Sequence, residues 1–347
     1  MTGVRPLAVT LGDPAGIGPD IAICAWRERK ELSLPPFVAV GPADALKARA
    51  HRLGIEVPIE AVLRHDAGTA LFARALPVLD VPTARPVVPG TPDAANAQAV
   101  IQCIDRAVAA VEDGEAAAIV TCPISKSVLQ SAGFRHPGHT EYLAALAEQR
   151  RPGASIRPVM MLAGPDLRVV PLTIHIPLAR VPAAISAPLI IETARITAAA
   201  LAADFGIPRP RIAVTGLNPH AGESGTLGRE EVEIIEPALR ALAAEGLCVT
   251  GPHSADALFH PLARKTYDAV IAMYHDQALI PLKTIAFDEG VNVTLGLPFV
   301  RTSPDHGTAF DIAGTGRARH QSLVAALRLA AEIVPCRARA ASDKGAR

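Results

Sequence analysis

Aromatic residues are scarce in this chain of 347 residues, because Phe, Tyr and Trp together make up only 3% of it. Half of the residues are hydrophobic, so the core must be built mainly from Ala, Val, Leu and Ile. An excess of charge of one sign is also lacking, since 34 Lys and Arg balance 34 Asp and Glu. Without a positive field the chain has no general attraction for nucleic acid or an anionic membrane. Any anionic ligand must therefore be held by local cations.

Long apolar runs are missing as well. The two most apolar stretches, Ala183–Ile191 and Ile196–Ala203, are separated by Glu192 and Arg195 before either reaches the roughly 20 residues of a membrane span. The N-terminal segment does not have the pattern of a secretory signal. The five cysteines show no C-x-x-C spacing, which argues against a zinc ribbon and fits reduced thiols. We expect a cytoplasmic protein with neither a membrane nor a nucleic-acid partner.

Short apolar runs alternate with segments of helical spacing along the whole chain. Strands are predicted over Leu7–Leu11, Phe37–Val40, Ala117–Thr121, Val159–Ala163, Arg168–Ile174, Arg211–Gly216 and Ala269–Tyr274. Helices are predicted over Asn96–Glu112, Ala183–Asp204, Arg229–Glu245 and Gln321–Ile333, and Pro-rich loops over Pro77–Pro92 and Arg151–Pro158. The length favours two domains. This alternation predicts an α/β fold with a mainly parallel sheet.

A glycine-rich turn follows the first predicted strand, in residues 12–19 (GDPAGIGP). Ligands of open α/β sheets bind beyond the carboxyl ends of the strands, and backbone N–H groups of such a turn can approach a phosphate or cofactor. The spacing is not G-x-G-x-x-G, so a standard Rossmann fingerprint is absent. Taken alone, the turn is equally well explained as a structural tight turn.

Three further predicted strands lead to a histidine: His175, His220 and His275. A single histidine in such a place is more often a hydrogen-bonded structural or surface residue. Three imidazoles at equivalent places in the topology indicate a site for a divalent metal with positions left open for substrate oxygens. Imidazoles accept Zn²⁺, Mg²⁺, Co²⁺ and Mn²⁺, so the identity of the metal stays open. Four other histidines, His51, His65, His260 and His320, lack this pattern and are expected to be solvated.

Candidate contacts for an anionic substrate fall in two segments. His139 and Thr140 begin a predicted helix after a Gly-Pro turn, and substrate oxygens are favoured at the N-terminus of a helix. Taken alone, Thr140 is equally well explained as the N-cap of that helix. Lys283, Asn292 and Arg301 lie in or just after an otherwise apolar stretch, where a carboxylate or phosphate ligand would explain the cations. Lys126 is a weaker candidate of the same kind.

Together these motifs make the chain recognisable over nearly its whole length. TLGDPAGIGPD, PGHTEYLA, GLNPHAGESG, YHDQALIPLKT and NVTLGLPFVRTSPDHGTAFDIAGTG resemble the 4-hydroxythreonine-4-phosphate dehydrogenase family of vitamin B6 biosynthesis. That family is similar in turn to isocitrate and isopropylmalate dehydrogenases. The resemblance implies two α/β/α lobes around a cleft, and a homodimer whose active sites use residues of both subunits. One difference is Ser224-Gly225, where the family often has Gly-Gly.

The resemblance also implies roles for individual residues. It assigns one divalent metal to His175, His220 and His275, with His275 donated by the partner chain, and substrate contacts to His139, Thr140, Lys283, Asn292 and Arg301. It assigns NAD or NADP to loops that contain Gly12, Gly16, His306, Gly307, Asp311 and Gly314. The general base stays open among Asp256, Asp276, Lys283 and a metal-bound water.

The resemblance implies oxidation of 4-phosphooxy-L-threonine at C3, followed by decarboxylation to 3-amino-2-oxopropyl phosphate. Alternatives are a dehydrogenase of phosphorylated erythronate or threonate or of an aromatic cis-dihydrodiol, and a metal-dependent hydrolase on the same scaffold. For the domains, we expect residues 1–135 with 295–335 to form the first lobe. Residues 136–294 form the second lobe, with the metal and the dimer contacts, and residues 336–347 a disordered tail.

Overall fold

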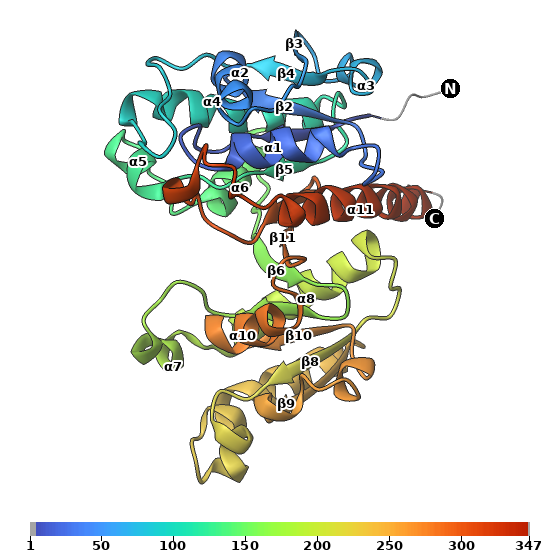
Figure 1. Ribbon diagram of the computed structural model, residues 1–347. Coiled ribbons are helices and arrows are strands. Elements are labelled where there is room, and N and C mark those ends of the chain that lie inside the picture. The colour runs from blue at the N-terminus through green and yellow to red at the C-terminus, as the bar shows by residue number, and fades with distance from the viewer. Residues whose placement is uncertain (1–4, 346–347) are drawn as a thin grey trace. The chain divides into compact units, whose positions relative to one another are not determined.

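The computed structural model describes residues 5–345 and divides into two compact units (Figure 1). Unit 1 runs up to Pro158 and includes Leu297–Val334. Unit 2 consists of Val159–Gly296 and the chain from Pro335 on. Each unit contains six of the described strands, and we refer to these six strands as the sheet of that unit.

The sheet of unit 1 is parallel throughout, with strand order β3-β4-β2-β1-β5-β12. Its strands are β1 Leu7–Thr10, β2 Phe37–Gly41, β3 Ile59–Val62, β4 Leu76–Asp80, β5 Ile119–Thr121 and β12 Arg301–Pro304. All residues of β1, β2 and β5 are buried. Such strands are typical of a parallel sheet that helices cover on both faces, as Figure 1 shows.

The helices of unit 1 pack apolar stripes onto this sheet. They are α1 Gly18–Arg27, α2 Ala43–Arg52, α3 Gly68–Leu71, α4 Ala97–Glu112, α5 Lys126–Ser131 and α6 His139–Gln149, with short η1 Ala94–Asn96 and η7 Phe310–Ile312. In α4, Cys103, Ile104, Ala107 and Val108 recur at helical spacing and are buried against β1 and β2. Helix α11 spans Gln321–Gly345.

The sheet of unit 2 has strand order β11-β6-β7-β10-β8-β9, and β6 is antiparallel to both of its neighbours. Its strands are β6 Val159–Ala163, β7 Arg168–Pro171, β8 Arg211–Thr215, β9 Cys248–His253, β10 Ala269–Ala272 and β11 Val291–Leu295. Its helices are α7 Val181–Ala184, α8 Ala187–Asp204, α9 Glu236–Ala244 and α10 His275–Ala286, with the short turns η2 Leu178–Arg180, η3 Pro219–Gly225, η4 Glu231–Ile235, η5 Ala255–Ala257 and η6 Ala263–Lys265.

The predicted α/β class is confirmed, and all seven predicted strands are present, Val159–Ala163 with the predicted ends and the other six with slightly different ends. Five strands were missed: β3, β4, β9, β11 and β12. Pro77 misled the prediction at β4, because a proline inside an apolar run argues against a strand. The predicted helix over Ala183–Asp204 breaks before Ser186, whose hydroxyl accepts from Leu189 N and caps α8.

The boundary between the units differs from the predicted one after residue 135. Helix α6 packs on α4, and Arg151 donates from both terminal nitrogens to Glu112 at 2.8 Å, so residues 136–158 belong to unit 1. The tail differs as well, because α11 continues through residues 336–345. Arg337 anchors that part of the helix by pairing with the buried Asp204 at 2.6 Å. Residues 346 and 347 of the predicted tail lie outside the described residues.

Within residues 5–345, no single helix is long and apolar enough to cross a membrane. One bent pair, Leu178–Ala184 with Ala187–Asp204, passes the same test of length and composition.

Candidate active site

Three neighbouring strands of unit 2 deliver the three predicted histidines. The parallel strands β7, β10 and β8 lie in that order in the sheet, so their carboxyl ends share one edge. His175 follows β7, His275 begins α10 directly after β10, and His220 lies in η3 after β8. The predicted placement of these imidazoles beyond strand ends is therefore what the structure has.

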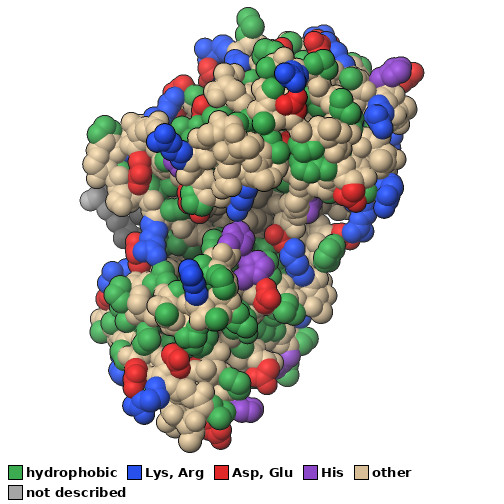
Figure 2. All heavy atoms as spheres, turned by 90° about the vertical axis from the view of Figure 1, so that its left-hand side faces the viewer, with side chains coloured by type: hydrophobic (Ala, Val, Ile, Leu, Met, Phe, Trp, Pro, Cys, Tyr) green, Lys and Arg blue, Asp and Glu red, His purple; other side chains and the backbone are tan. Residues whose placement is uncertain are grey.

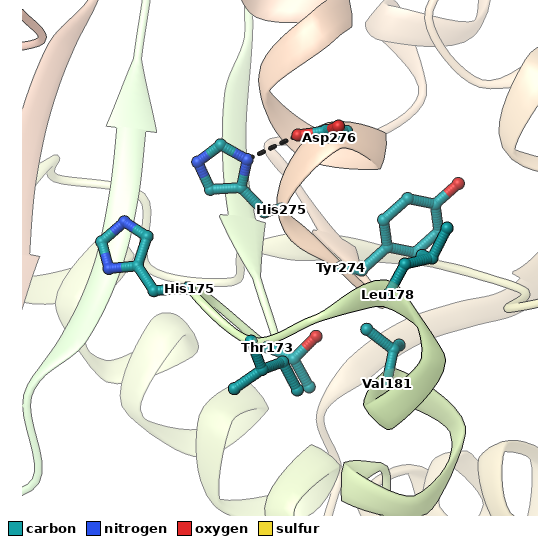
Figure 3. A pocket seen from close by; sticks show the side chains of 8 residues that line it. Thr173, His175, Leu178, Val181, Tyr274, His275 and Asp276 are labelled. Atoms are coloured by element: carbon teal, nitrogen blue, oxygen red, sulfur yellow. Dashed lines mark hydrogen bonds and ion pairs between the residues drawn. The ribbon is translucent and has the colours of Figure 1, made fainter.

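Two of these histidines line one pocket of about 240 Å³ (Figure 3). The ring centroids of His175 and His275 are 5.8 Å apart. His275 Nδ1 donates to Asp276 Oδ1 at 2.7 Å, which leaves Nε2 as the ring nitrogen with a lone pair. The remaining lining residues are Thr173, Ile176, Leu178, Val181 and Tyr274.

The geometry of His175 and His275 fits two ligands of one ion. With metal–nitrogen bonds of about 2.1 Å, two imidazoles on one tetrahedral ion have ring centroids about 5 Å apart. A carboxylate behind a ligating histidine, as Asp276 stands behind His275, is the usual support of such a ligand. His175 and His220 both have a left-handed backbone with φ of 52°, an uncommon conformation outside glycine that clusters at functional sites.

Among residues 5–345, no group of three His, Cys, Asp or Glu side chains is close enough to hold an ion. His175 and His220 are both exposed. The structure thus brings His175 and His275 together and leaves His220 outside their group.

Polar side chains whose role the sequence interpretation missed fix the loops behind these histidines. Gln277 Oε1 accepts from Met273 N and Thr215 Oγ1, both at 2.7 Å, and its Nε2 donates to Gly216 O at 2.9 Å. It therefore ties the end of β8 to the end of β10. Thr173 Oγ1 donates to Met273 O at 2.8 Å and ties β7 to the same strand end.

Glu231 does the same for the loop that carries His220. It is 1% exposed, and its Oε1 accepts from the backbone N–H groups of Leu217 and Asn218 at 2.8 and 2.7 Å. Its Oε2 accepts from Asn218 Nδ2 at 3.0 Å. A buried carboxylate with a full set of donors holds its loop in one conformation. The acidic pair at 230–231 was the only sequence signal for this role.

Unit 1 contains a second site, which we call the anion cluster: Lys126, His139 and Arg301. Burial lowers the pKa of His139 well below its ordinary value, and the nearby charges of Arg301 and Lys126 lower it further. His139 Nε2 is buried and finds no hydrogen-bond partner in the described chain. Lys126 Nζ lies beside Gly138, the residue before His139. A ligand with anionic oxygens would satisfy this arrangement.

Arg301 is the deepest member of the anion cluster, at 4% exposed. Its Nε and Nη2 donate to Thr121 Oγ1 at 3.2 and 2.7 Å. Burial lowers the pKa of Arg301 to about 10, and Glu141 acts in the opposite direction. A guanidinium held in this way suits the bidentate binding of a phosphate or carboxylate.

Of the other predicted substrate and base residues, Thr140 follows His139 on α6, whereas Lys283, Asn292 and Asp256 lie in unit 2. Thr140 is not a helix cap, because Gly138 occupies that position of α6. In unit 2, Lys283 lies on α10 with its Nζ 5.8 Å from the Phe287 ring centre, and Asn292 on β11 has a buried Oδ1 without a partner in the described chain. Asp256 is exposed, and its pKa is lowered by a hydrogen bond from Ser254 Oγ and by nearby His220.

The two predicted cofactor loops lie together in unit 1. Ile17 N donates to Thr308 O at 3.0 Å, and Gly314 N donates to Asp20 Oδ1 at 2.8 Å. In the loop of residues 306–314, Gly307 and Asp311 are exposed, and no described atom lies within 4 Å of the place of a Cβ at Gly307. An open backbone beside an exposed carboxylate suits the ribose and phosphates of a dinucleotide.

The glycine-rich turn itself does not present the backbone donors that the sequence suggested. The N–H groups of Asp13, Gly16 and Ile17 donate to Pro123 O, Asp13 O and Thr308 O. A Cβ at Gly12 would stand 2.1 Å from Pro123 O, so this glycine permits a close approach of two protein segments. The expectation that these three N–H groups bind a phosphate or cofactor is therefore wrong, because each already donates to a carbonyl oxygen of the protein.

The comparisons with known proteins agree with this picture. The family model described as pyridoxal phosphate biosynthetic protein PdxA matches residues 33–330. A 4-hydroxythreonine-4-phosphate dehydrogenase of Methylorubrum populi is 58% identical over 95% of this chain and 94% of its own. The crystal structure of the Klebsiella pneumoniae enzyme of that name is 40% identical, has a TM-score of 0.83, and covers 95% of this chain and 99% of its own.

A more distant solved structure is a terephthalate 1,2-cis-dihydrodiol dehydrogenase from Burkholderia xenovorans. It is 31% identical, with a TM-score of 0.61, over 95% of this chain and 98% of its own. Fold and relatives together define an α/β oxidoreductase of the dehydrogenase class. Within that class, the chain belongs to the PdxA family.

Proposed function

We propose that this protein oxidises 4-phosphooxy-L-threonine at C3 with NAD or NADP and decarboxylates the product to 3-amino-2-oxopropyl phosphate. The observation that carries the proposal is the match to relatives of that name along nearly the whole chain. The anion cluster supports it physically, because a phosphorylated acid needs fixed cations in a chain without net charge.

The reaction balances without a further reactant. The C3 hydroxyl loses its proton and C3 loses a hydride to the nicotinamide, which gives a β-keto acid. The C1–C2 bond then breaks with release of CO₂, and C2 takes up one proton. A divalent ion supplies Lewis-acid chemistry in both steps when it is bound, by lowering the pKa of the hydroxyl and by favouring electron flow toward the carbonyl.

The residues of this chain divide the remaining work. His175, His220 and His275 would hold the ion, and Asp276 orients His275 rather than acting as the base. The anion cluster would hold the phosphate or carboxylate of the substrate. His139 is neutral at neutral pH because of its lowered pKa, so it can donate one hydrogen bond without repelling Arg301. The general base stays open between Asp256, Lys283 and a water.

We propose that the histidine site is completed in a homodimer. Unit 2 exposes several large apolar side chains: Ile176, Leu178, Leu227, Leu262, Ile280, Ile285 and Phe287. Figure 2 shows one face of the molecule, on which hydrophobic side chains also reach the surface. Ile176 and Leu178 also line the pocket of His175 and His275, so exposed apolar side chains adjoin that pocket. Apolar surface at such a place is typical of an interface.

Two divisions of the ligands between the chains are consistent with such a dimer. The family resemblance implies that His275 is the partner's histidine. The 5.8 Å between the His175 and His275 rings favours the other division, in which these two come from one chain and the partner contributes His220. The predicted cytoplasmic location stays a prediction.

The test of the proposed reaction measures NADH and CO₂ with the phosphorylated amino acid as substrate. We expect both in equal amounts, and no turnover of unphosphorylated 4-hydroxythreonine. Faster turnover of 4-phosphoerythronate or 4-phosphothreonate, or NADH without CO₂, would replace the proposal by one of the related dehydrogenases. Metal-dependent turnover without NAD would indicate a hydrolase.

A further inference from the structure

Two arginines of helix α2, Arg49 and Arg52, donate hydrogen bonds to the two loops that the proposed function assigns to the cofactor. These loops are the glycine-rich turn of residues 12–19 and the loop of residues 306–314. Arg49 is 2% exposed. Its Nη1 donates to Gly16 O at 2.9 Å and its Nη2 to Pro14 O at 3.0 Å, so it holds two carbonyl groups of the glycine-rich turn. Its Nη1 also pairs with the carboxylate of Asp20.

Asp20 carries the connection to the second loop. This carboxylate on α1 is 1% exposed, and its Oδ1 accepts from Gly314 N at 2.8 Å while its Oδ2 pairs with Arg49. Arg52 Nε donates to Gly314 O at 3.0 Å. The N–H of Gly314 is thereby bonded to Asp20 and its carbonyl to Arg52, and the residue has a left-handed backbone with φ of 69°. One connected set of polar contacts, of which those of Arg49 and Asp20 are buried, fixes the turn and the loop together.

Stability alone does not require the buried ion pair of Arg49 and Asp20. Replacing a buried ion pair by apolar side chains of similar volume is often neutral or stabilising, so such a pair is weak evidence for a role in stability. This pair has a geometric result that apolar side chains could not reproduce. It fixes three backbone groups of two loops, which are Pro14 O, Gly16 O and Gly314 N. A separate backbone contact, from Ile17 N to Thr308 O, joins the same loops.

We propose that Arg49, Asp20 and Arg52 are positioning residues that hold the 306–314 loop in the conformation that binds the nicotinamide dinucleotide. The glycine-rich turn is then the support of that loop and not a cradle for phosphate. Gly16 fits this role, because a Cβ there would stand 2.9 Å from Thr308 O. The inference rests on the proposed function, since the ligand of the loop is the cofactor of that reaction.

The test is direct titration of the full-length enzyme with NAD and with NADP, followed by steady-state kinetics. The double variant Arg49→Met/Asp20→Asn removes both charges at similar volume and keeps an acceptor for Gly314 N. We expect the dissociation constant of the preferred dinucleotide to rise tenfold or more and its KM to rise likewise. The KM for the phosphorylated substrate and the metal content should stay as in the wild type.

Arg52→Ala keeps the test decisive if the double variant fails to fold, because this arginine is exposed and gives up a single contact. We expect about a threefold rise in the dissociation constant. Arg328→Ala is the matched control, since Arg328 also donates to one distant carbonyl of unit 1, that of Leu32, away from both loops. It should bind the dinucleotide as the wild type does.

Three results would count against these ideas in separate ways. Folded Arg52→Ala or double variants with wild-type affinity for the dinucleotide would overturn the positioning role. An equal rise in KM for dinucleotide and for substrate would indicate general damage and would also overturn it. A wild-type enzyme that binds neither NAD nor NADP would overturn the proposed function itself.

Discussion

The proposed cofactor loops of unit 1 are held by buried contacts within one chain, whereas two histidine loops of unit 2 expose their imidazoles to solvent. In unit 1, Arg49 and Asp20 are almost fully buried and bond to both loops. In unit 2, His175 and His220 are exposed and have a left-handed backbone. This difference is what the proposed function requires, if the dinucleotide site of unit 1 is complete within one chain and the histidine site of unit 2 is completed by a second chain.

The largest expected effect comes from removing one histidine of unit 2. His220→Ala should lose most of the bound metal and lower turnover by about 100-fold or more, since loss of a mere supporting partner already costs 10- to 100-fold. Metal analysis beside circular dichroism measures it, and the fold should survive because the side chain is exposed. Full activity of a metal-depleted variant would contradict the metal mechanism.

The anion cluster should give the next largest effect. Arg301→Ala removes a buried cation from the proposed substrate site, a change that typically costs about 2 to 5 kcal/mol. We expect kcat/KM to fall about 30-fold or more, at about 1.4 kcal/mol for each factor of ten. Arg301→Lys keeps the charge and should recover part of the loss. An unchanged kcat/KM in a folded alanine variant would remove Arg301 from the site.

A supporting residue of unit 2 should matter less than a ligand. Glu231→Gln puts an N–H₂ group opposite the backbone donors or Asn218 Nδ2, which disturbs the loop of His220. We expect metal affinity to fall about tenfold while the KM for the dinucleotide is unchanged. Glu233→Gln is the control, because Glu233 is exposed and pairs with Arg229. Equal metal affinity in both variants would show that Glu231 has no positioning role.

The smallest effect on activity is expected at His65, which was predicted to be solvated and is instead 1% exposed in unit 1. Burial, together with the charge of Arg106, lowers the pKa of His65 to about 4. The unfolded chain binds this proton below about pH 6.5 and the folded chain does not, so stability falls as the pH drops from 6.5 to 4.

The corresponding loss is at most about 3 kcal/mol, at 1.36 kcal/mol for each unit of pKa. His65→Leu should flatten the pH dependence of the urea midpoint over this range and leave kcat at neutral pH unchanged. His139 contributes in the same direction, so some dependence remains. An identical pH profile in the variant would show that His65 is not the group responsible.

The strand exits could be predicted from sequence because apolar runs that end in histidine report local topology directly. His175, His220 and His275 all lie where that pattern placed them. Arg49 and Glu231 could not be found in this way, since each acts on backbone groups far away in sequence or in a turn whose shape no short motif specifies. Strand β12 was missed because Arg301 begins it, and a charge at the start of a buried strand reads as a loop.

The central proposal is that the dinucleotide site of unit 1 needs one chain, whereas the histidine site of unit 2 needs two. Mixing inactive chains tests it most directly. Three single variants are prepared: His175→Ala, His220→Ala and His275→Ala. They are mixed two at a time under conditions in which subunits exchange. If one histidine of the three comes from the partner, a hybrid dimer contains one intact site in two of the three pairings. An equal mixture with free exchange then regains about a quarter of the wild-type activity.

We expect activity to return in exactly those two pairings. The pair that stays inactive identifies the two histidines that come from the same chain, and the short ring distance favours His175 with His275 as that pair. An inactive pair of His175 with His220 would instead assign His275 to the partner, as the family resemblance implies. Failure of all three pairs under demonstrated subunit exchange would contradict the shared site, because it would mean that each chain supplies its own three ligands.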